Sequence, residues 1–488
     1  MTGASPTSSS DSSPGTGASA IVLPLALAQF IASYAATNMN VAIGAIAADL
    51  HTTVIGLQTA ITLFTLTMAS LMIPGSKLTD IWGRKRCFVA GLIVYGIGGL
   101  IAALAPRLGV LIGGYSLLEG TGSALLIPPV YILITVAFRD VKSRAKYFGV
   151  VSGAGGLGAA AGPLIGGLIT SSTSWRASFG LQVVVVACII VLARRISDAP
   201  PAPPRPRFDI EGAALSAAGL FFVVLGILLS SQYGWITARK DFKVAGTVVI
   251  AKGGISPVWL FVAVGALILL WFFLHLRRCQ QLGKEPLLHL RLFRDKTANL
   301  GLGTQLAQWL VLQGSFFVIS VYVQEVQGKN AIETGLILTP ATVGILLASA
   351  AAGRLARRHP QRRLIIAGFI TTSAGMVLLL ALVRQHSSPA SFVPGLVLMG
   401  LGVGVMLTFS VDVVQSAFPE HDQGDISGLS RSVSNLGSSL GTALAGSIVV
   451  AVRLPAGKPF AAAVIVLLGF SLIGLLAAVL MPRRSQAP

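Results

Sequence analysis

Two acidic side chains, Glu119 and Asp412, stand apart because they fall inside long apolar stretches of this 488-residue chain. The other carboxylates lie in tails or loops or, for Glu325, at a helix end. An ionisable group within an apolar span is costly and is a functional candidate by default. Burial also favours the protonated carboxyl over the carboxylate. The position of Glu119, midway along residues 108–136, therefore predicts a proton carrier.

Both acids also allow a structural interpretation. Glu119 could stay protonated or hydrogen-bonded to a neighbour such as Tyr115 or Ser123, with no part in proton transfer. Asp412 lies towards the end of its span, where an ion pair with Arg431 is the favoured interpretation.

The composition places these residues in a membrane protein. Hydrophobic residues make up 54% of the chain, charged residues only 11%, and the mean hydropathy is +0.80. A soluble domain carries about 25% charged residues. Apolar stretches of about 20 residues can each cross a bilayer as a helix, so the predicted fold class is an all-α integral membrane protein. Fourteen transmembrane helices are predicted, at 21–46, 54–74, 87–106, 108–136, 147–170, 175–193, 212–231, 257–277, 297–325, 334–356, 363–383, 391–417, 427–450 and 459–481.

Positive charge alternates between the predicted loops. Lys and Arg gather after the second, fourth, sixth, eighth, tenth and twelfth spans, which places these loops and both termini in the cytoplasm. The net charge of +19 is therefore spread over many short loops, a pattern that argues against a nucleic-acid-binding face. The loop 232–256 is an exception, because it is placed outside and is itself basic.

An internal repeat organises the spans: residues 76–86 align without gaps on residues 353–363, each after the second helix of a six-helix unit. Parallel halves of this kind occur in secondary transporters. The predicted units are a disordered cytoplasmic tail (1–19), a first six-helix half (20–195), a Pro-rich cytoplasmic linker (196–211), two additional helices with an outer loop (212–278), a second cytoplasmic linker (279–296), a second six-helix half (297–482) and a cytoplasmic tail (483–488).

Two motifs concentrate the polar and small residues. The first is a predicted turn between two spans, and it contains Ser76, Asp80, Gly83, Arg84 and Lys85. Its glycine gives the turn backbone freedom, and its cations hold the turn at the cytoplasmic surface. The second lies in the fifth span and contains Gly158, Gly162, Pro163, Gly166 and Gly167. Small residues four apart let helices approach closely, and the proline is expected to bend the helix.

With these motifs, the chain resembles the major facilitator superfamily of transporters over nearly all of residues 20–482, and in particular its fourteen-span drug:proton antiporter branch. The first motif is similar to the family pattern Gly-x-Leu-x-Asp-x-x-Gly-Arg-[Arg/Lys], with Ser76 in place of the leading glycine, and the second resembles the antiporter motif. The resemblance implies two six-helix halves plus two extra central helices, with alternating access to a cleft between the halves.

The resemblance also implies a gating role for Asp80, which would close the cytoplasmic side against a helix N-terminus and basic residues of the other half. The alternative is a solvated loop carboxylate beside cations that set the topology. In the second copy of the repeat Arg357 takes this position, so the latch is predicted to be one-sided.

The chain departs from the branch at two coupling positions. Its fourth span reads Ser116-Leu117-Leu118-Glu119-Gly120 where the branch has Arg-x-x-Gln-Gly. Its first span has Ala35 where the branch has an aspartate. Either coupling has moved to Glu119, or the protein runs uncoupled or on another gradient.

A central cavity is implied between the halves, lined by polar and aromatic residues. The candidates for substrate contact are Asn38, Asn40, Gln305, Gln308, Trp309, Gln313, Ser432 and Asn435. Interhelical hydrogen bonds are the alternative role for each. A cavity with so few charges favours neutral, amphiphilic or weakly cationic solutes.

The predicted function is secondary active efflux of hydrophobic or amphiphilic small molecules across the inner (plasma) membrane, driven by proton entry. An uncoupled lipid or metabolite translocator or importer, and a non-transporting sensor or scaffold, are the alternatives. The expected partners are the small-molecule substrate, protons and membrane lipids, without nucleic acid. No nucleotide-binding loop or catalytic triad is recognisable, so neither an enzyme nor a cofactor is predicted. Cys87, Cys188 and Cys279 have no paired spacing, so neither a disulfide framework nor a metal site is predicted.

Overall fold

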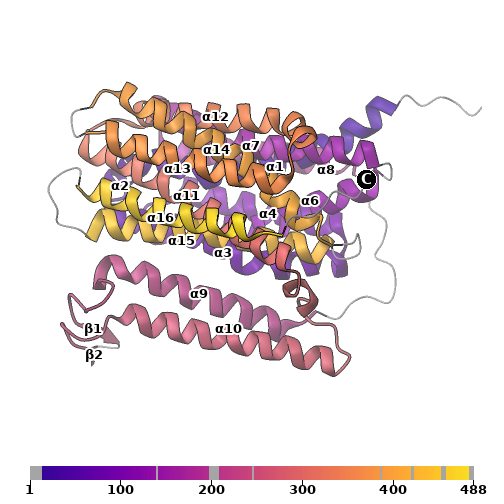
Figure 1. Ribbon diagram of the computed structural model, residues 1–488, viewed down its shortest axis with the longest axis horizontal. Helices are drawn as coiled ribbons and strands as arrows, with labels where there is room; N and C mark the ends of the chain where they lie inside the picture. Colours follow the sequence, from indigo (N-terminus) through magenta and orange to yellow (C-terminus); the bar gives the residue numbers. More distant parts are fainter. Residues whose placement is uncertain are drawn as a thin grey trace, which may run out of the picture.

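Long helices that run side by side make up most of the protein (Figure 1). The computed structural model describes residues 14–138, 141–196, 208–244, 247–384, 387–418, 423–451 and 458–482. The elements before the Pro-rich segment are α1 (Pro14–Val41), α2 (Ile43–Asp49), α3 (Val54–Trp82), α4 (Arg84–Ala103), α5 (Leu108–Leu111), the π-helix η1 (Ile112–Glu119), α6 (Gly120–Ala137), α7 (Val141–Ser172) and α8 (Trp175–Ala193).

The elements after this segment begin with a helical hairpin. They are α9 (Ile210–Tyr233), β1 (Phe242–Val244), β2 (Thr247–Ile250), α10 (Pro257–Gln281), η2 (Leu290–Phe293), α11 (Lys296–Val321), the π-helix η3 (Tyr322–Val326), α12 (Ala331–Arg358), α13 (Gln361–Leu382), η4 (Pro389–Phe392), α14 (Val393–Gln415), α15 (Gln423–Ala451) and α16 (Lys458–Leu480).

Length and apolar composition qualify most of these helices as membrane spans. Within the described residues, twelve helices meet both criteria, and the two arms of α7 make a thirteenth if they form one bent span. The serine-rich α15 is as long as its neighbours but is not among them. An all-α, multi-pass membrane protein is therefore confirmed, whereas the count of fourteen spans stays a prediction.

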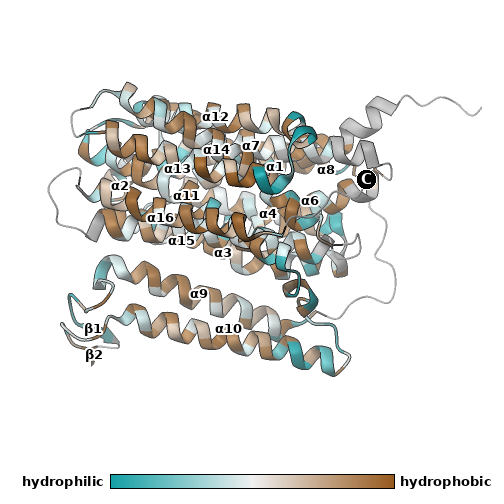
Figure 2. Ribbon diagram, viewed as in Figure 1, coloured by the Kyte–Doolittle hydropathy of each residue, from teal (hydrophilic) through white to brown (hydrophobic). Residues whose placement is uncertain are grey.

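The exposed surface of the helices is itself apolar, as expected for a protein in lipid. On α10, for example, Trp259, Leu267 and Trp271 are each more than half exposed. Figure 2 shows hydrophobic residues along the middle of the helices and hydrophilic residues mainly towards their ends. This distribution matches a hydrocarbon layer bounded by two polar surfaces.

The hairpin of α9 and α10 lies to one side of the other helices (Figure 1). Its helices pack on each other, and α9 also contacts α3 and α15. The basic loop between them, which is predicted to lie outside, contains an antiparallel pair, β1 and β2, that was not predicted from the sequence. A second apolar cluster fixes the other end of α10, where Phe272 and Leu276 pack with Leu287 and Leu292.

Several predicted boundaries differ from the observed helices, and two of these differences affect the first motif and the predicted tail. The helix α3 does not end at residue 74 but continues to Trp82, so most of the first motif is helical and Gly83 alone makes the turn, at φ = +97°. The polar residues of this segment lie beyond the apolar stretch, but the helix continues past Pro74 and Gly75 and ends only at Gly83. At the other end, α1 begins at Pro14, inside the predicted tail, because proline is well tolerated in a first helical turn. Residues 1–13 lie outside the described residues.

Candidate functional site

The glycines of the second motif form the face of α7 that packs on α1. A Cβ built at Gly158 would overlap the backbone of Phe30, and one built at Gly162 would overlap the hydroxyl of Thr37. Only glycine therefore allows the two helices to approach so closely at these positions.

Pro163 bends α7, and α1 compensates for the hydrogen bond that the proline removes. The arms Gly149–Ala159 and Ala161–Ser172 meet at an angle of 42°. Because proline has no N–H, the carbonyl of Ala159, four residues earlier, loses its helical donor. The hydroxyl of Thr37 donates to this carbonyl at 3.0 Å. Thus the predicted bend is present, and the Ala159 carbonyl that lost its helical donor accepts a hydrogen bond from α1 instead.

A second face of α7 packs on α12, which belongs to the second predicted half. A Cβ built at Gly167 would overlap the carbonyl of Ala331, and one built at Gly335 would overlap the carbonyl of Pro163. The two helices therefore meet backbone to backbone through one glycine from each. The motif thus lies at a contact between the halves.

Hydrogen bonds also join the halves near the predicted outer end of the helices. The side chain of Gln324 donates to the carbonyl of Asn40 at 3.0 Å and accepts from the N–H of Gly44 at 2.8 Å. The hydroxyl of Ser171 accepts from the N–H of Ile332 at 3.1 Å.

The first motif meets α15 at the opposite end. The Nζ of Lys77 lies 3.5 Å from Oδ1 of Asp425, and the two side chains are only 12% and 15% exposed. A Cβ built at Gly428 would lie 3.0 Å from the Cβ of Ser76. Asp425 is in the first turn of α15, where the helix dipole favours an acid. The two halves therefore share an ion pair whose acid comes from α15, a residue that the sequence analysis had assigned to a loop.

The other residues of the first motif have separate positions. Asp80 is in the last turn of α3, but its side chain lies outside the described residues, so its gating role stays a prediction. Arg84 opens α4. The Nζ of Lys85 donates to the carbonyl of Arg194 at 3.1 Å, a contact within the first half.

Beyond the Lys77–Asp425 ion pair, side-chain hydrogen bonds join α3 and α15 along the rest of their length. In each, a polar side chain of one helix donates to a backbone carbonyl of the other. The pairs are Gln58 with Ala443 (3.0 Å), Ser439 with Thr62 (3.0 Å) and Ser432 with Ala69. The polar residues of α15 lower the hydropathy of this helix. Two of them, Ser432 and Ser439, bind α3 of the first half.

The predicted ion pair between Asp412 and Arg431 is wrong in this structure. Asp412, at the end of α14, accepts a hydrogen bond from the side chain of Gln361 at the start of α13. Arg431 lies on the face of α15 that meets α6, where it donates to the hydroxyl of Tyr131 and its guanidinium carbon lies 5.1 Å from the ring centroid. Arg431 thus becomes another contact between the halves.

Glu119 is fully buried at the end of η1, and neither carboxylate oxygen has a hydrogen-bond partner among the described residues. A Cβ built at Gly99 of α4 would lie 3.0 Å from its Oε1, so the carboxyl faces α4 within the first half. Tyr115 donates instead to the carbonyl of Ala35 at 3.3 Å, and the hydroxyl of Ser123 has no partner in the described part of the chain. Neither of the two predicted hydrogen-bond partners therefore satisfies Glu119.

A buried polar cluster lies on α8 and its neighbours in the same half. Ser178 contacts the hydroxyl of Tyr34 at 2.6 Å and accepts from the amide of Asn38 at 2.8 Å. One turn further along α8, Gln182 accepts from the hydroxyl of Tyr95 at 2.6 Å, while its own amide nitrogen has no partner among the residues that the structure describes. Within those residues, the first half therefore holds both an acid and an amide donor without a hydrogen-bond partner.

The substrate candidates divide into two groups. Gln305 is satisfied inside the second half, because it donates to the carbonyl of Ser410 at 2.9 Å and accepts from Ser430 at 2.7 Å. Gln313 donates across the halves to the carbonyl of Ala36 at 2.6 Å. These two glutamines have the interhelical role that the sequence analysis gave as the alternative.

Several candidates retain hydrogen-bonding capacity, and Gln313 is among them because its Oε1 is buried without a partner in the described part of the chain. Both side-chain polar atoms of Asn40 and of Gln308 are buried without a partner among the described residues, as is Oδ1 of Asn38. A Cβ at Gly166 would overlap that Asn38 oxygen. Trp309 and Asn435 are partly exposed. Asn40 and Gln308 therefore remain the stronger substrate candidates.

Comparison with known families agrees with this arrangement. The model of the Major Facilitator Superfamily matches residues 25–442 and, in a second match, residues 301–488. The chain belongs to the Major Facilitator Superfamily.

Several curated relatives of this superfamily member are named for export or resistance. The chain is 28% identical to the "Probable actinorhodin transporter" of Streptomyces coelicolor, over 84% of this chain and 69% of that protein. It is 26% identical to "Multidrug resistance protein Stp" of Mycobacterium tuberculosis, over 81% and 69%. It is 28% identical to "Cephamycin export protein CmcT" of Amycolatopsis lactamdurans, over 88% and 84%.

Three structural features of the site were not predicted from the sequence. The Lys77–Asp425 ion pair and the donation from Thr37 to Ala159 both join helices that are distant in sequence. Only the second left a local signal, because a helical proline always frees the carbonyl four residues before it. The π-helix that ends at Glu119 left no such signal.

Proposed function

We propose that this protein exports hydrophobic or amphiphilic small molecules across the cytoplasmic membrane by alternating access, with both termini in the cytoplasm. The observation that carries the proposal is the backbone contact of the antiporter motif, at Gly167 and Pro163 of α7, with α12 of the other half. Two relatives that match more than four fifths of the chain, one named for multidrug resistance and one for cephamycin export, support the direction of transport.

The contacts between the halves suit a rocking motion. The hydrogen bonds of Gln324 hold one end of the interface, and the Lys77–Asp425 ion pair with the Arg431–Tyr131 contact holds the other. Opening towards one side requires only the contacts at that end to break. The bent, glycine-rich α7 provides a close-packed hinge between the halves.

Proton coupling is assigned to Glu119. An ionised carboxylate without a hydrogen-bond donor is very costly to bury, so this closed arrangement favours the protonated carboxyl. Release of the proton then requires a rearrangement that brings water or a donor to Glu119. The carboxyl terminates the π-helix η1, and a π-helix is a local irregularity frequently found at functional sites. The next residue, Gly120, packs on Phe64 and Thr67 of α3, so a movement of α3 would directly shift the backbone beside Glu119.

A transport assay in proteoliposomes tests both parts of the proposal. The purified protein is reconstituted, a pH gradient is imposed, and the accumulation of tetraphenylphosphonium, a lipophilic cation, and of a neutral amphiphilic dye is followed. We expect gradient-driven accumulation by the wild type. In Glu119→Gln, we expect accumulation to be lost while counterflow of the same solute without a gradient persists, because the glutamine cannot carry a proton.

The matched control is Glu325→Gln, which changes an exposed acid at the end of η3 and should behave as the wild type. Normal accumulation by Glu119→Gln would refute the proton assignment but leave export intact. Absence of movement of every probe by the folded wild type, with or without a gradient, would contradict the transport proposal itself.

A further inference from the structure

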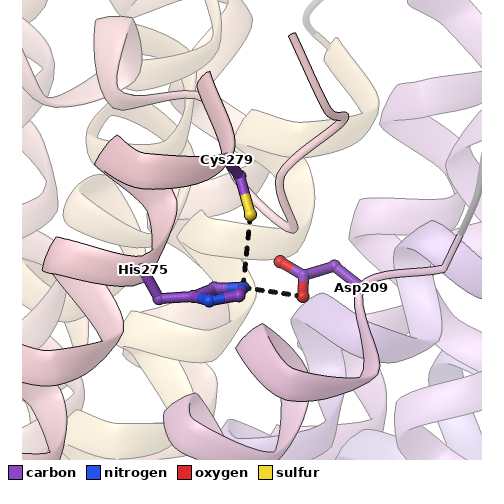
Figure 3. A group of neighbouring side chains, drawn as sticks. All are labelled: Asp209, His275 and Cys279. Carbon is purple, nitrogen blue, oxygen red and sulfur yellow. Dashed lines mark hydrogen bonds and ion pairs between the residues drawn. The ribbon is translucent and has the colours of Figure 1, made fainter. Parts of the chain in front are cut away.

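We propose that Asp209, His275 and Cys279 form a binding site for a zinc ion at the predicted cytoplasmic end of the α9–α10 hairpin. Figure 3 shows the three side chains converging from the start of α9 and the last turns of α10. One ligand atom from each residue lies within 4.8 Å of the others. This site is separate from the interface between the halves and does not depend on the proposed transport function.

The distances between the ligand atoms are close to those of a tetrahedral zinc site. The Nε2 of His275 lies 2.9 Å from Oδ1 of Asp209 and 3.4 Å from Sγ of Cys279. Zinc binds nitrogen or oxygen at about 2.0–2.2 Å and sulfur at about 2.3 Å, so tetrahedral angles separate its ligand atoms by about 3.3–3.6 Å. The two distances from His275 are thus within about half an ångström of those in a tetrahedral site, and the ligand atoms of Asp209 and Cys279 lie within 4.8 Å of each other.

The spacing along α10 explains why two of the ligands meet. His275 and Cys279 are four residues apart, so they lie on one face of the helix. Asp209 is the N-cap of α9 and accepts from the backbone N–H groups of Gly212 and Leu287 at 2.8 and 3.0 Å. The carboxylate that would complete the site is thus already fixed in position by the backbone.

A second carboxylate supports the imidazole from its other side. The Nδ1 of His275 lies 3.4 Å from Oε1 of Glu211, which is one residue into α9. Metal-binding histidines almost always donate their other ring N–H to a carboxylate, a carbonyl or water, and this contact fixes the tautomer and the ring. A small rotation of the Glu211 side chain, which is 62% exposed, would let it accept from Nδ1 and leave Nε2 free for the metal.

The surroundings and ligand types select zinc over the hard cations. The side chains of His275 and Asp209 are 10% and 9% exposed, and Cys279 is buried beside the apolar cluster around Leu276 and Leu287. A thiolate, an imidazole and a carboxylate suit zinc, whereas magnesium and calcium prefer oxygen ligands. Binding replaces the thiol proton of Cys279, which passes to solvent, with a sulfur–zinc bond. Water or an external ligand would take the fourth position.

Cobalt substitution provides the direct test. The full-length wild type, purified in detergent without a polyhistidine tag and freed of metal with a chelator, is titrated with Co²⁺. We expect one equivalent to produce the thiolate-to-cobalt absorption of a tetrahedral site, and Zn²⁺ to displace it. Absence of this absorption in the folded wild type would show that the three residues form only an ion-pair and hydrogen-bond cluster, and would overturn the proposal.

Variants assign the ligands. Cys279→Ser should abolish the thiolate absorption, and Cys188→Ser, which changes an exposed cysteine of α8, should leave it unchanged. Glu211→Gln should weaken zinc binding by about 10- to 100-fold without removing the absorption. If Cys279→Ser does not fold, alkylation of the wild type decides: Zn²⁺ should protect Cys279 but not Cys188. Equal protection, or none, would contradict the assignment.

Discussion

The interface between α3 and α15 and the interface between α7 and α12 join the same two halves by different means. Along α3 and α15, side chains such as Gln58 and Ser439 donate to carbonyls of the facing helix, and Lys77 pairs with Asp425. Between α7 and α12, Gly167 and Gly335 bring the two backbones into contact. One interface depends on polar groups, and the other depends on shape.

This difference gives the two interfaces different tolerances to movement. A hydrogen bond between membrane helices contributes only about 0.6 kcal/mol on average, so the contacts of α3 and α15 can be exchanged for water or for other partners one by one. The close packing at a glycine contact cannot be replaced by water or by another partner, but it lets one backbone slide or rotate on another. The α7–α12 interface is therefore suited to act as the pivot, and the α3–α15 interface to open and close.

The α9–α10 hairpin reinforces this asymmetry. It contacts α3 and α15 through α9, and in Figure 1 it lies on the side of the molecule away from α7 and α12. The two copies of the first motif also differ, because their leading residues pack differently. Ser76 is buried against Gly428, whereas Gly353 of the second copy is exposed and a Cβ there would meet nothing within 4 Å. The expected one-sided character of the latch fits this difference.

A bulky residue at the α7–α12 interface should have the largest effect. In Gly167→Leu the side chain would have to displace the carbonyl of Ala331, and overpacking of this kind costs about 3 kcal/mol. We expect a large fall in thermal stability in detergent and loss of transport in proteoliposomes. Gly156→Leu is the control on the same helix, because nothing lies within 4 Å of a Cβ there. Equal effects of the two variants would show that α7 does not use a specific face.

Removal of charge at the α3–α15 interface should have an intermediate effect. Loss of a hydrogen bond between charged groups costs about 1.5 kcal/mol or more, which corresponds to about a tenfold shift between conformations. Lys77→Gln and Asp425→Asn should each change the transport rate accordingly, and the double variant should add little to either. Arg354→Gln, at an exposed position of the second copy, should have no effect. Additive losses in the double variant would show that the two residues act independently.

The helices themselves could be predicted from the sequence, but most contacts between them could not. The predicted span 175–193 coincides with α8, because an apolar run follows the capping residue Ser174 and ends at charged residues. The Lys77–Asp425 pair joins residues 348 positions apart, and its existence depends on how α3 and α15 pack. The failure of the Asp412–Arg431 prediction has the same origin, since nearby ends of two helices can face different neighbours.

Part of the proposed zinc site has a pattern that is visible in the sequence. His275 and Cys279 lie at i and i+4 of one helix, a spacing that brings two ligands together, although the third ligand, Asp209, comes from another helix. Glu119 was found because an acid within an apolar span is visible in the sequence. Its lack of a partner depends on where Gly99 and Tyr115 are placed by packing, and only the structure could provide that.

A single hydroxyl at the α3–α15 interface should matter less than the ion pair. Ser439→Ala removes the donation to the carbonyl of Thr62, and we expect a loss of about 0.6 kcal/mol with little change in transport rate. At the other interface, Ser171→Ala removes the acceptor of the Ile332 N–H and provides the matched variant. If the α7–α12 interface depends on shape, Ser171→Ala should have no larger effect than Ser439→Ala. A severe effect of either change would contradict this division between polar and steric interfaces.

The smallest effect is expected at an ion pair outside both interfaces. Asp49, the last residue of α2, accepts from Arg176 and from Trp175 of α8, and the hydrogen bond from Arg176 lowers the pKa of Asp49 below its usual value of 3.8. A lowered folded-state pKa means that this stabilisation is complete above pH 3.8 and is lost as the pH falls through the folded value. Because Asp49 is 44% exposed and Arg176 is 35% exposed, the contribution should be about 0.5 kcal/mol or less. Thermal melts should therefore show Asp49→Asn slightly less stable than the wild type at neutral pH, with the difference shrinking below about pH 4 and transport at neutral pH unchanged. A difference that grew on acidification, or a loss of transport, would mean that this end of the first half takes part in the movement that the two interfaces are proposed to control.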